Sequence, residues 1–165
     1  MFNENNWREY YNIVEDLMHT DSVRSMQQFR HHYCVTCYEH SVFVSYISFR
    51  LARRLGIDYT SAARGALLHD LFLYDSADKD NIDGMQCFFH PQAALINAVK
   101  LYELSDKEKN IILSHMWPLA LIMPNSKEAV VVNIADKYCA ILEVLRVWHR
   151  MQVRRHMPRP KSKVI

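Results

Sequence analysis

Glycine and proline are scarce in this sequence. Its 165 residues include 3 glycines and 5 prolines, which is too few for the many tight turns of a protein built from short strands. Half of the residues are hydrophobic and 12% are aromatic, a composition that excludes a disordered chain. The sequence therefore predicts an all-α fold in a single domain, long enough to bury about two-thirds of its unfolded surface.

Long hydrophobic runs are also missing. No uninterrupted apolar stretch approaches the ~20 residues that span a bilayer, and the polar, acidic N-terminus is unlike a signal peptide. We therefore expect a cytoplasmic protein with no membrane partner, whose four cysteines are reduced thiols. Cys34 and Cys37 form a C-x-x-C pair that could be redox-active or half of a zinc site, but there is no second pair and no βαβ pattern around it. Two packed thiols are the simpler interpretation.

Positive charge is concentrated at the C-terminal end. Residues 150–165 contain six of the 20 Lys and Arg residues and no acid, so residues 1–149 carry 14 basic against 18 acidic side chains. We interpret residues 1–149 as the helical domain and 150–165 as a basic, flexible tail, which either is solvated or contacts RNA, anionic lipid or a partner protein. A mildly acidic body does not favour nucleic acid as a partner. The oligomeric state stays open, with a homodimer as one option.

Apolar spacing, capping residues and helix breakers predict where the helices lie. Helices are expected over residues 5–19, 22–29, 36–55, 58 to about 70, 91–104, 105–115 and 125–148. The fourth contains small residues around Gly65, which suggest close packing against a neighbour, and carries His69 and Asp70 near its C-terminal end. The polar loop over residues 75–84 is either a substrate lid or a solvated linker.

Nine histidines are the unusual feature of the composition, and several lie on apolar helix faces. His69 and Asp70 are adjacent in an apolar run, and burying an ionised carboxylate costs several kcal/mol unless cations or hydrogen bonds compensate. Any single buried histidine could be an ordinary hydrogen-bonded core residue. A shared metal centre explains the whole set at once, because these ligand types suit first-row divalent metals: His40, His69, Asp70, His90, His115 and Asp136.

The order of these residues resembles the HD phosphohydrolase superfamily. The resemblance covers roughly residues 30–146 and rests on three segments: Tyr38-Glu39-His40-Ser41-Val42, Leu67-Leu68-His69-Asp70 and Ile134-Ala135-Asp136-Lys137. His90 and His115, which lie between the last two segments, are similar to histidines in members that hold two metals. Those members include the symmetrical dinucleoside-tetraphosphate hydrolases and the cyclic-di-GMP phosphodiesterase branch.

The resemblance implies a ligand set and a reaction. One metal would be held by His40, His69, Asp70 and Asp136, and a second by His90 and His115, with Asp70 bridging the two. The metals would be two divalent ions, with Fe or Mn favoured and Zn, Co, Ni or Mg as options. A water or hydroxide shared by the metals would attack the phosphorus atom of a small-molecule phosphate ester or nucleotide.

Substrate contacts are harder to assign. Lys137 follows the last ligand and is expected to be catalytic together with Asp70 and to hold a phosphate, although a surface lysine is the alternative. Arg30, His31 and His32 precede the first ligand helix and could reach the mouth of the site. We expect Arg30 and His32 to contact substrate phosphate, and ordinary loop packing is the alternative. Many catalytic members carry a lysine three residues after the aspartate of the pair, where this sequence has Leu73. The pocket is therefore expected to be more apolar than in those members. A minority of the superfamily uses the same ligands to activate dioxygen, so a di-iron oxygenase is one alternative, and a non-catalytic nucleotide-binding module is another.

Overall fold

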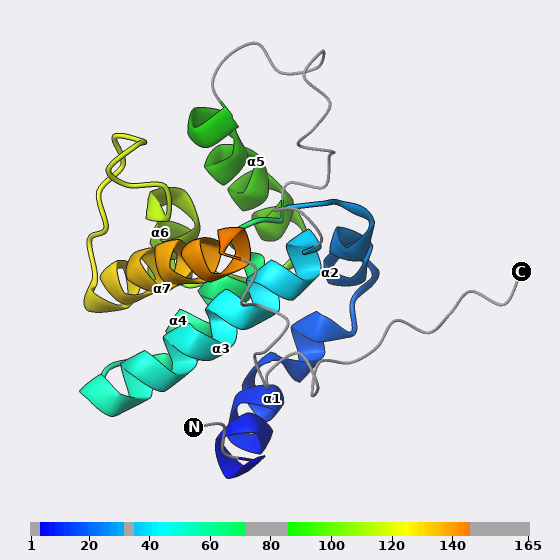
Figure 1. The fold of residues 1–165 in the computed structure, drawn as a ribbon, viewed down its shortest axis with the longest axis vertical. Helices are drawn as coiled ribbons and strands as arrows, with labels where there is room; N and C mark the ends of the chain where they lie inside the picture. Colours follow the sequence, from blue (N-terminus) through cyan, green and yellow to red (C-terminus); the bar gives the residue numbers. More distant parts are fainter. Residues whose placement is uncertain (1–3, 32–34, 72–85, 146–165) are drawn as a thin grey trace, which may run out of the picture.

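The computed structural model of the chain describes residues 4–31, 35–71 and 86–145 (Figure 1). These residues form helices with no strand, apart from an isolated β-bridge between Arg30 and Thr36. The helices are α1 (Glu4–Met18), α2 (Asp21–Ser25), α3 (Cys37–Leu55), α4 (Tyr59–Leu68), α5 (Gln86–Leu101), α6 (Asp106–Ser114) and α7 (Lys127–Val144), with a 3-10 turn, η1 (Met26–Gln28), after α2. The predicted all-α class is confirmed. Several predicted features lie outside the described residues: His32, Cys34, Leu73, the loop over 75–84 and the basic tail over 150–165.

Local side chains set the helix starts. At α3, the Thr36 hydroxyl accepts the Glu39 N–H at 3.1 Å and the Glu39 carboxylate accepts the Thr36 N–H at 3.1 Å. Ser105 and Glu108 form the same reciprocal cap at α6. The α3 helix ends at Gly56, which has a left-handed backbone with φ of 67°, a conformation that glycine adopts without strain.

Several predicted boundaries differ from the structure by one to five residues, including the ends of α5 at Leu101 and of α7 at Val144. The α4 and α6 helices end at Leu68 and Ser114, so His69, Asp70 and His115 lie in the turns that follow the helices and not inside them. The α5 helix begins at Gln86, so Pro91 is inside it and not at its start. Proline is favoured at the first position of a helix. Here α5 extends for one more turn before Pro91, and the helix lacks the one hydrogen bond that Pro91 cannot donate because it has no backbone N–H. The predicted helix over 22–29 is divided into α2 and η1.

The α3 helix is central to the packing. It contacts α4 and α7, while α4 contacts α6, and α6 contacts α5. In Figure 1, α7 lies beside α3, with α5 above them and α1 below. None of the described helices is both long enough and apolar enough to cross a membrane.

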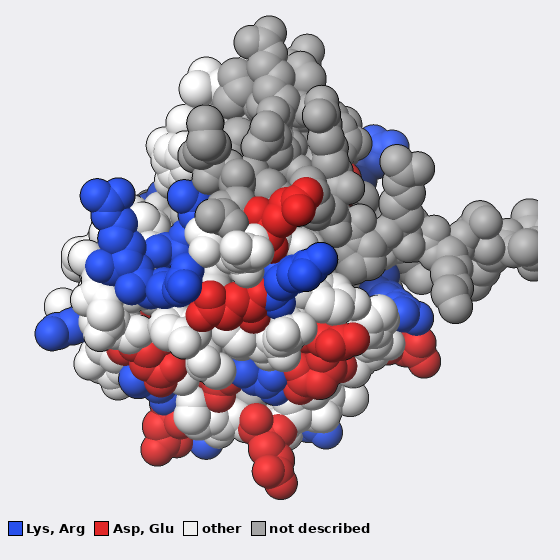
Figure 2. Space-filling model, turned by 90° about the horizontal axis from the view of Figure 1, so that it is seen from below, with Lys and Arg blue, Asp and Glu red and all other residues white. Residues whose placement is uncertain are grey.

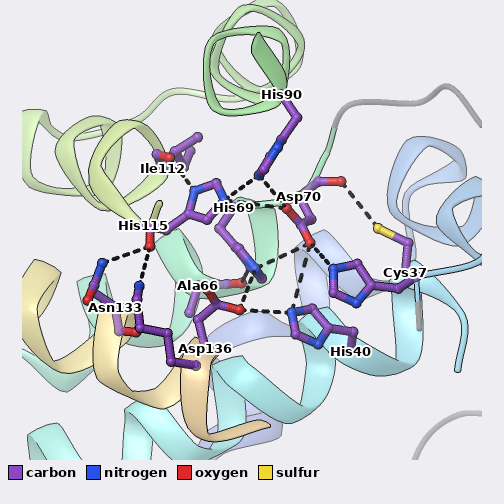
Figure 3. A network of polar contacts seen from close by, with 12 residues as sticks. Cys37, His40, Ala66, His69, Asp70, His90, Ile112, His115, Asn133 and Asp136 are labelled. Carbon is purple, nitrogen blue, oxygen red and sulfur yellow. Dashed lines mark hydrogen bonds and ion pairs between the residues drawn. The ribbon is translucent and has the colours of Figure 1, made fainter. Parts of the chain in front are cut away.

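The predicted close approach of the fourth helix is confirmed at Gly65. A Cβ atom at this position would lie 2.9 Å from Cγ2 of Ile111 on α6, closer than such atoms pack. Glycine therefore lets α4 and α6 pack closely. The C-terminal ends of these two helices carry His69 and His115, and both rings lie in the same cluster (Figure 3).

Candidate metal centre

The six predicted ligands come together in one cluster (Figure 3). His40 lies in the first turn of α3, and Asp136 lies on α7. His69 and Asp70 follow α4, His90 lies in α5, and His115 follows α6. Five of the six are buried, and the side chain of His90 is 14% exposed. Residues from five separate segments thus line one buried polar site.

The first group of ligand atoms belongs to His40, His69, Asp70 and Asp136. Asp136 Oδ1 lies 3.1 Å from His40 Nε2 and 3.7 Å from His69 Nε2. Asp70 Oδ2 lies 3.4 Å from His69 Nε2 and 3.9 Å from His40 Nε2. Ligand atoms about 2.0–2.2 Å from one ion lie roughly 3 Å from one another. The distances of 3.1–3.9 Å are close to this spacing, and ligand atoms of His40, His69 and Asp136 all lie within 4.8 Å of one another, so these three residues can approach one ion.

The second group faces the other oxygen of Asp70. His90 Nε2 and His115 Nε2 are 2.7 Å apart, and each lies 3.6 Å from Asp70 Oδ1. The two oxygens of Asp70 thus face different groups, Oδ2 toward the first and Oδ1 toward the second. This is the geometry of a carboxylate that can serve two ions.

Backbone carbonyls orient two of the imidazoles. His69 Nδ1 lies 2.7 Å from the Ala66 carbonyl, and His115 Nδ1 lies 2.6 Å from the Ile112 carbonyl. A carbonyl can only accept, so each Nδ1 carries a proton, and in its neutral form each ring directs its Nε2 lone pair into the cluster. This arrangement is usual for metal-binding histidines.

The residues present fit a metal ion. His69 Nε2 is buried and has no hydrogen-bond partner among the described residues, although it faces carboxylate oxygens of Asp70 and Asp136. A nitrogen lone pair facing anionic oxygens is unfavourable unless a cation or a proton lies between them. His40, His69 and Asp136 form one group able to hold an ion, and His69, Asp70 and His115 form another.

The charges of the cluster also fit a bound metal ion. Burial alone would raise the pKa of Asp70 and Asp136, but the surrounding imidazoles hold the pKa of both carboxyls well below the usual range. Without a metal the same carboxylates, acting against burial, raise the pKa of His69 to about 9. Burial and neighbouring imidazoles lower the pKa of His115 to about 3, so its ring is neutral and keeps a lone pair for a metal.

Side chains from neighbouring helices hold the turns that carry the ligands. The Cys37 thiol donates to the Asp70 carbonyl at 3.3 Å. Asn133 donates from Nδ2 to the carbonyls of His115 at 2.7 Å and Trp117 at 2.8 Å, which have no helical partner after α6 ends. Burial raises the pKa of Cys37 well above its usual value, so Cys37 is a packed thiol and not a reactive thiolate.

The described residues that were predicted to contact substrate phosphate are not gathered at the cluster in the way that the predicted metal ligands are. Lys137 is half-buried, and its ammonium donates to the His115 carbonyl at 3.0 Å. Arg30 is exposed, and its backbone takes part in the β-bridge with Thr36. The structure therefore brings the metal ligands together, whereas the phosphate-binding roles of Lys137, Arg30 and His32 stay predictions.

Two residues at the site were not among the predicted metal ligands. His31 stacks on His40 with 3.9 Å between ring centroids, and its Nε2 lies 3.2 Å from Asp70 Oδ2. Glu143 is buried on α7, with Oε1 2.9 Å from His40 Nδ1. One signal was available for Glu143, because it follows Asp136 by seven residues and so lies two turns along the same helix face.

Comparison with known proteins agrees with the fold. A model of the HD-domain family matches residues 37–141, which is more than half of the chain. The chain therefore belongs to the HD-domain family, a superfamily of metal-dependent phosphohydrolases. A comparison with curated proteins found no match.

Proposed function

We propose that this protein is a two-metal phosphohydrolase that acts on a small-molecule phosphate ester or nucleotide. The observation that carries the proposal is the orientation of Asp70, whose two oxygens face two separate groups of imidazoles. A site for a single ion would not need the second group. HD-domain membership agrees with the reaction class.

The chain's own residues would bind and orient two ions at a buried position. His40, His69 and Asp136 would serve the first ion, His90 and His115 the second, and Asp70 both. When bound, the metals would acidify a shared water and withdraw charge from the phosphoryl oxygens. Imidazole with carboxylate suits first-row divalent metals, and we favour Fe or Mn over Zn, Co, Ni or Mg.

Metal analysis tests the proposal directly. The purified protein should hold more than one equivalent of Fe, Mn or a similar ion. Asp70→Ala should lose metal together with phosphatase or phosphodiesterase activity, measured on a panel of phosphate esters with Mn²⁺, Fe²⁺, Co²⁺ and Mg²⁺. Asp106→Ala is the matched control, because its side chain is fully exposed at the start of α6. Unchanged metal content in Asp70→Ala would sink the proposal.

Two alternative outcomes have distinct signatures. Oxygen-dependent turnover with a mixed-valence iron signal would identify a di-iron oxygenase on the same ligands. Retained nucleotide binding with no turnover across the panel would identify a binding module in which metals have a structural role.

Phosphate binding by Lys137 is the part of the proposal with least structural support. Its amine would have to leave the His115 carbonyl to reach a phosphate. If it does so, Lys137→Met raises KM more than it lowers kcat. If Lys137 serves only to hold His115, the same substitution weakens metal binding and leaves KM for the loaded enzyme unchanged.

One face of the molecule also agrees with a small-molecule substrate. Acidic and basic side chains are interspersed on the face shown in Figure 2, without the continuous basic face that nucleic-acid binding favours. A cytoplasmic location stays a prediction, and the oligomeric state stays open, with a homodimer as one option.

A further inference from the structure

Glu143 is a buried carboxylate that the proposed ligand set does not use. Its side chain is fully buried on α7, where an apolar residue would pack at lower cost because a buried charge must be compensated. The groups that compensate it are two imidazoles. Glu143 Oε1 lies 2.9 Å from His40 Nδ1, and Oε2 lies 3.6 Å from His31 Nδ1.

The carboxylate orients His40. Because ionised Glu143 can only accept, Nδ1 of His40 carries the proton. The other nitrogen, Nε2, then faces Asp136 Oδ1 at 3.1 Å and Asp70 Oδ2 at 3.9 Å. Glu143 does for His40 what backbone carbonyls do for His69 and His115.

His31 repeats the orientation of His40. The two rings are stacked, with an interplanar angle of 18° and 3.9 Å between centroids. His31 Nδ1 points to the same carboxylate, and Nε2 lies 3.2 Å from Asp70 Oδ2, the oxygen that faces the first group. His31, His40 and Asp70 also form a group whose ligand atoms all lie within 4.8 Å of one another.

We infer that His31 is a further ligand of the first metal position, and that Glu143 is a positioning residue that directs Nε2 of both His31 and His40 at that position. The inference rests on the metal centre of the proposed function and enlarges its first group to five residues. The competing explanation is that His31 and Glu143 form an ion pair that stabilises the fold and has no effect on metal affinity.

Cobalt titration of the full-length protein separates these explanations. The metal-free protein is titrated with Co²⁺ in a His115→Ala background, which weakens the second group so that the first position dominates the signal. Affinity and visible d–d absorption are recorded for His31→Phe, which keeps a ring to stack on His40, and for Glu143→Gln, which keeps the shape of the side chain. Circular dichroism confirms that each variant is folded.

The control is Glu128→Gln. Glu128 is a second buried glutamate on α7, but it accepts the Asp58 N–H at 3.0 Å and pairs with Lys107 at 3.3 Å, away from the cluster. We expect Glu143→Gln to weaken Co²⁺ binding by about 10–100-fold. His31→Phe should also weaken binding and should change the d–d spectrum, since one nitrogen ligand is replaced, whereas Glu128→Gln should leave affinity and spectrum unchanged.

The negative outcomes are distinguishable. Affinity and spectrum unchanged in both His31→Phe and Glu143→Gln would overturn this inference and leave the proposed function standing. If the wild-type protein binds no Co²⁺, the proposed function and the inference both fail. If Glu143→Gln does not fold, His31→Phe decides the question, because its spectrum must differ from that of the parent for the inference to hold.

Discussion

The two oxygens of Asp70 face different groups of imidazoles, and neighbouring helices also hold the backbone at this residue. Its carbonyl accepts from the Cys37 thiol, and the Asn97 amide donates to the next carbonyl, that of Leu71, at 2.9 Å. Cys37 on α3 and Asn97 on α5 thus hold the backbone of the turn from which the Asp70 side chain extends. At the scale of single residues, the site depends on such contacts to its backbone as much as on the ligands themselves.

Asn133 offers a test of that dependence. Asn133→Leu keeps the approximate size of the side chain but removes the donor to the carbonyls of His115 and Trp117. We expect the free energy of unfolding to fall by about 1–3 kcal/mol, because the Trp117 carbonyl loses the Asn133 donor and the His115 carbonyl keeps only its bond from Lys137. Metal binding at the second position should also weaken, by roughly 10-fold or more.

Chemical denaturation and metal titration measure these two effects. Asn125→Leu is the control, since Asn125 is exposed in the connection before α7. A variant of Asn133 that loses stability but binds both metals normally would show that the His115 turn is held in place by other contacts.

The sequence was informative for the ligands and uninformative for their supports. Histidines and acids on apolar faces stand out, so the six residues that meet in the cluster could be selected from the sequence, and their role as metal ligands stays a prediction. Glu143 could not be linked to His40, because 103 residues separate them and only tertiary packing brings them together. His31 lies in a connecting segment. Because it has no place on a helix face, the sequence could not show that its side chain points toward Asp70.

At the scale of secondary structure, the C-terminal ends of α4 and α6 position two of the proposed ligands, His69 and His115. The α4 and α6 helices both end one residue before a ligand histidine, whose Nδ1 turns back to a carbonyl three residues earlier. Starts with capping boxes were predictable within a residue or two, because both capping partners are local in the sequence. The start of α5 was not, since proline marks a favoured position and not a required one.

Close packing of α4 on α6 predicts a strong effect at Gly65. Gly65→Val places a branched side chain against Ile111, whose nearest atom is already 2.9 Å from the position of a Cβ. We expect the free energy of unfolding to fall by about 1–3 kcal/mol through overpacking, and metal affinity to fall as His69 and His115 separate.

Thr60→Val on the exposed side of α4 controls for the introduction of valine into this helix. Thermal unfolding and Co²⁺ titration are the measurements. Equal stability of Gly65→Val and Thr60→Val would show that Ile111 moves aside at no cost.

The N-terminal ends of α4 and α7 are joined by Glu128. Although burial acts to raise the pKa of Glu128, backbone N–H groups including that of Asp58, together with Lys107, lower it. A carboxylate with a lowered pKa in the folded state stabilises the protein above its unfolded pKa, and this stability is lost as the pH falls through the folded value.

Glu128→Gln should therefore destabilise the protein by about 1 kcal/mol at pH 7, and the difference from wild type should shrink as the pH falls below ~4. Urea denaturation of both proteins between pH 3 and pH 7 measures it. A difference that stays constant over this range would mean that the charge of Glu128 has no part in the effect.

For the molecule as a whole, the cluster joins the five segments that carry its ligands at one place. Metal binding should stabilise the folded state by about 2.7 kcal/mol when the free metal is at 100 times its dissociation constant. For a chain of this size that corresponds to a rise in Tm of about 5–10 °C. Differential scanning calorimetry with and without a chelator tests this, and Asp70→Ala should show no such shift. The fold class of the whole molecule was predictable from composition, because scarce glycine and proline favour long helices. The placement of the helices relative to one another was not predictable, because it depends on tertiary packing.

The imidazoles of the centre are held in two different ways, and this has a consequence for how the protein tolerates mutation. His69 and His115 are oriented by backbone carbonyls of Ala66 and Ile112, which any residue at those positions supplies. The orientation of His40 depends on one side chain, that of Glu143. Random variation should therefore disable the centre far more often through position 143 than through positions 66 and 112, provided that the residues there still fit the core.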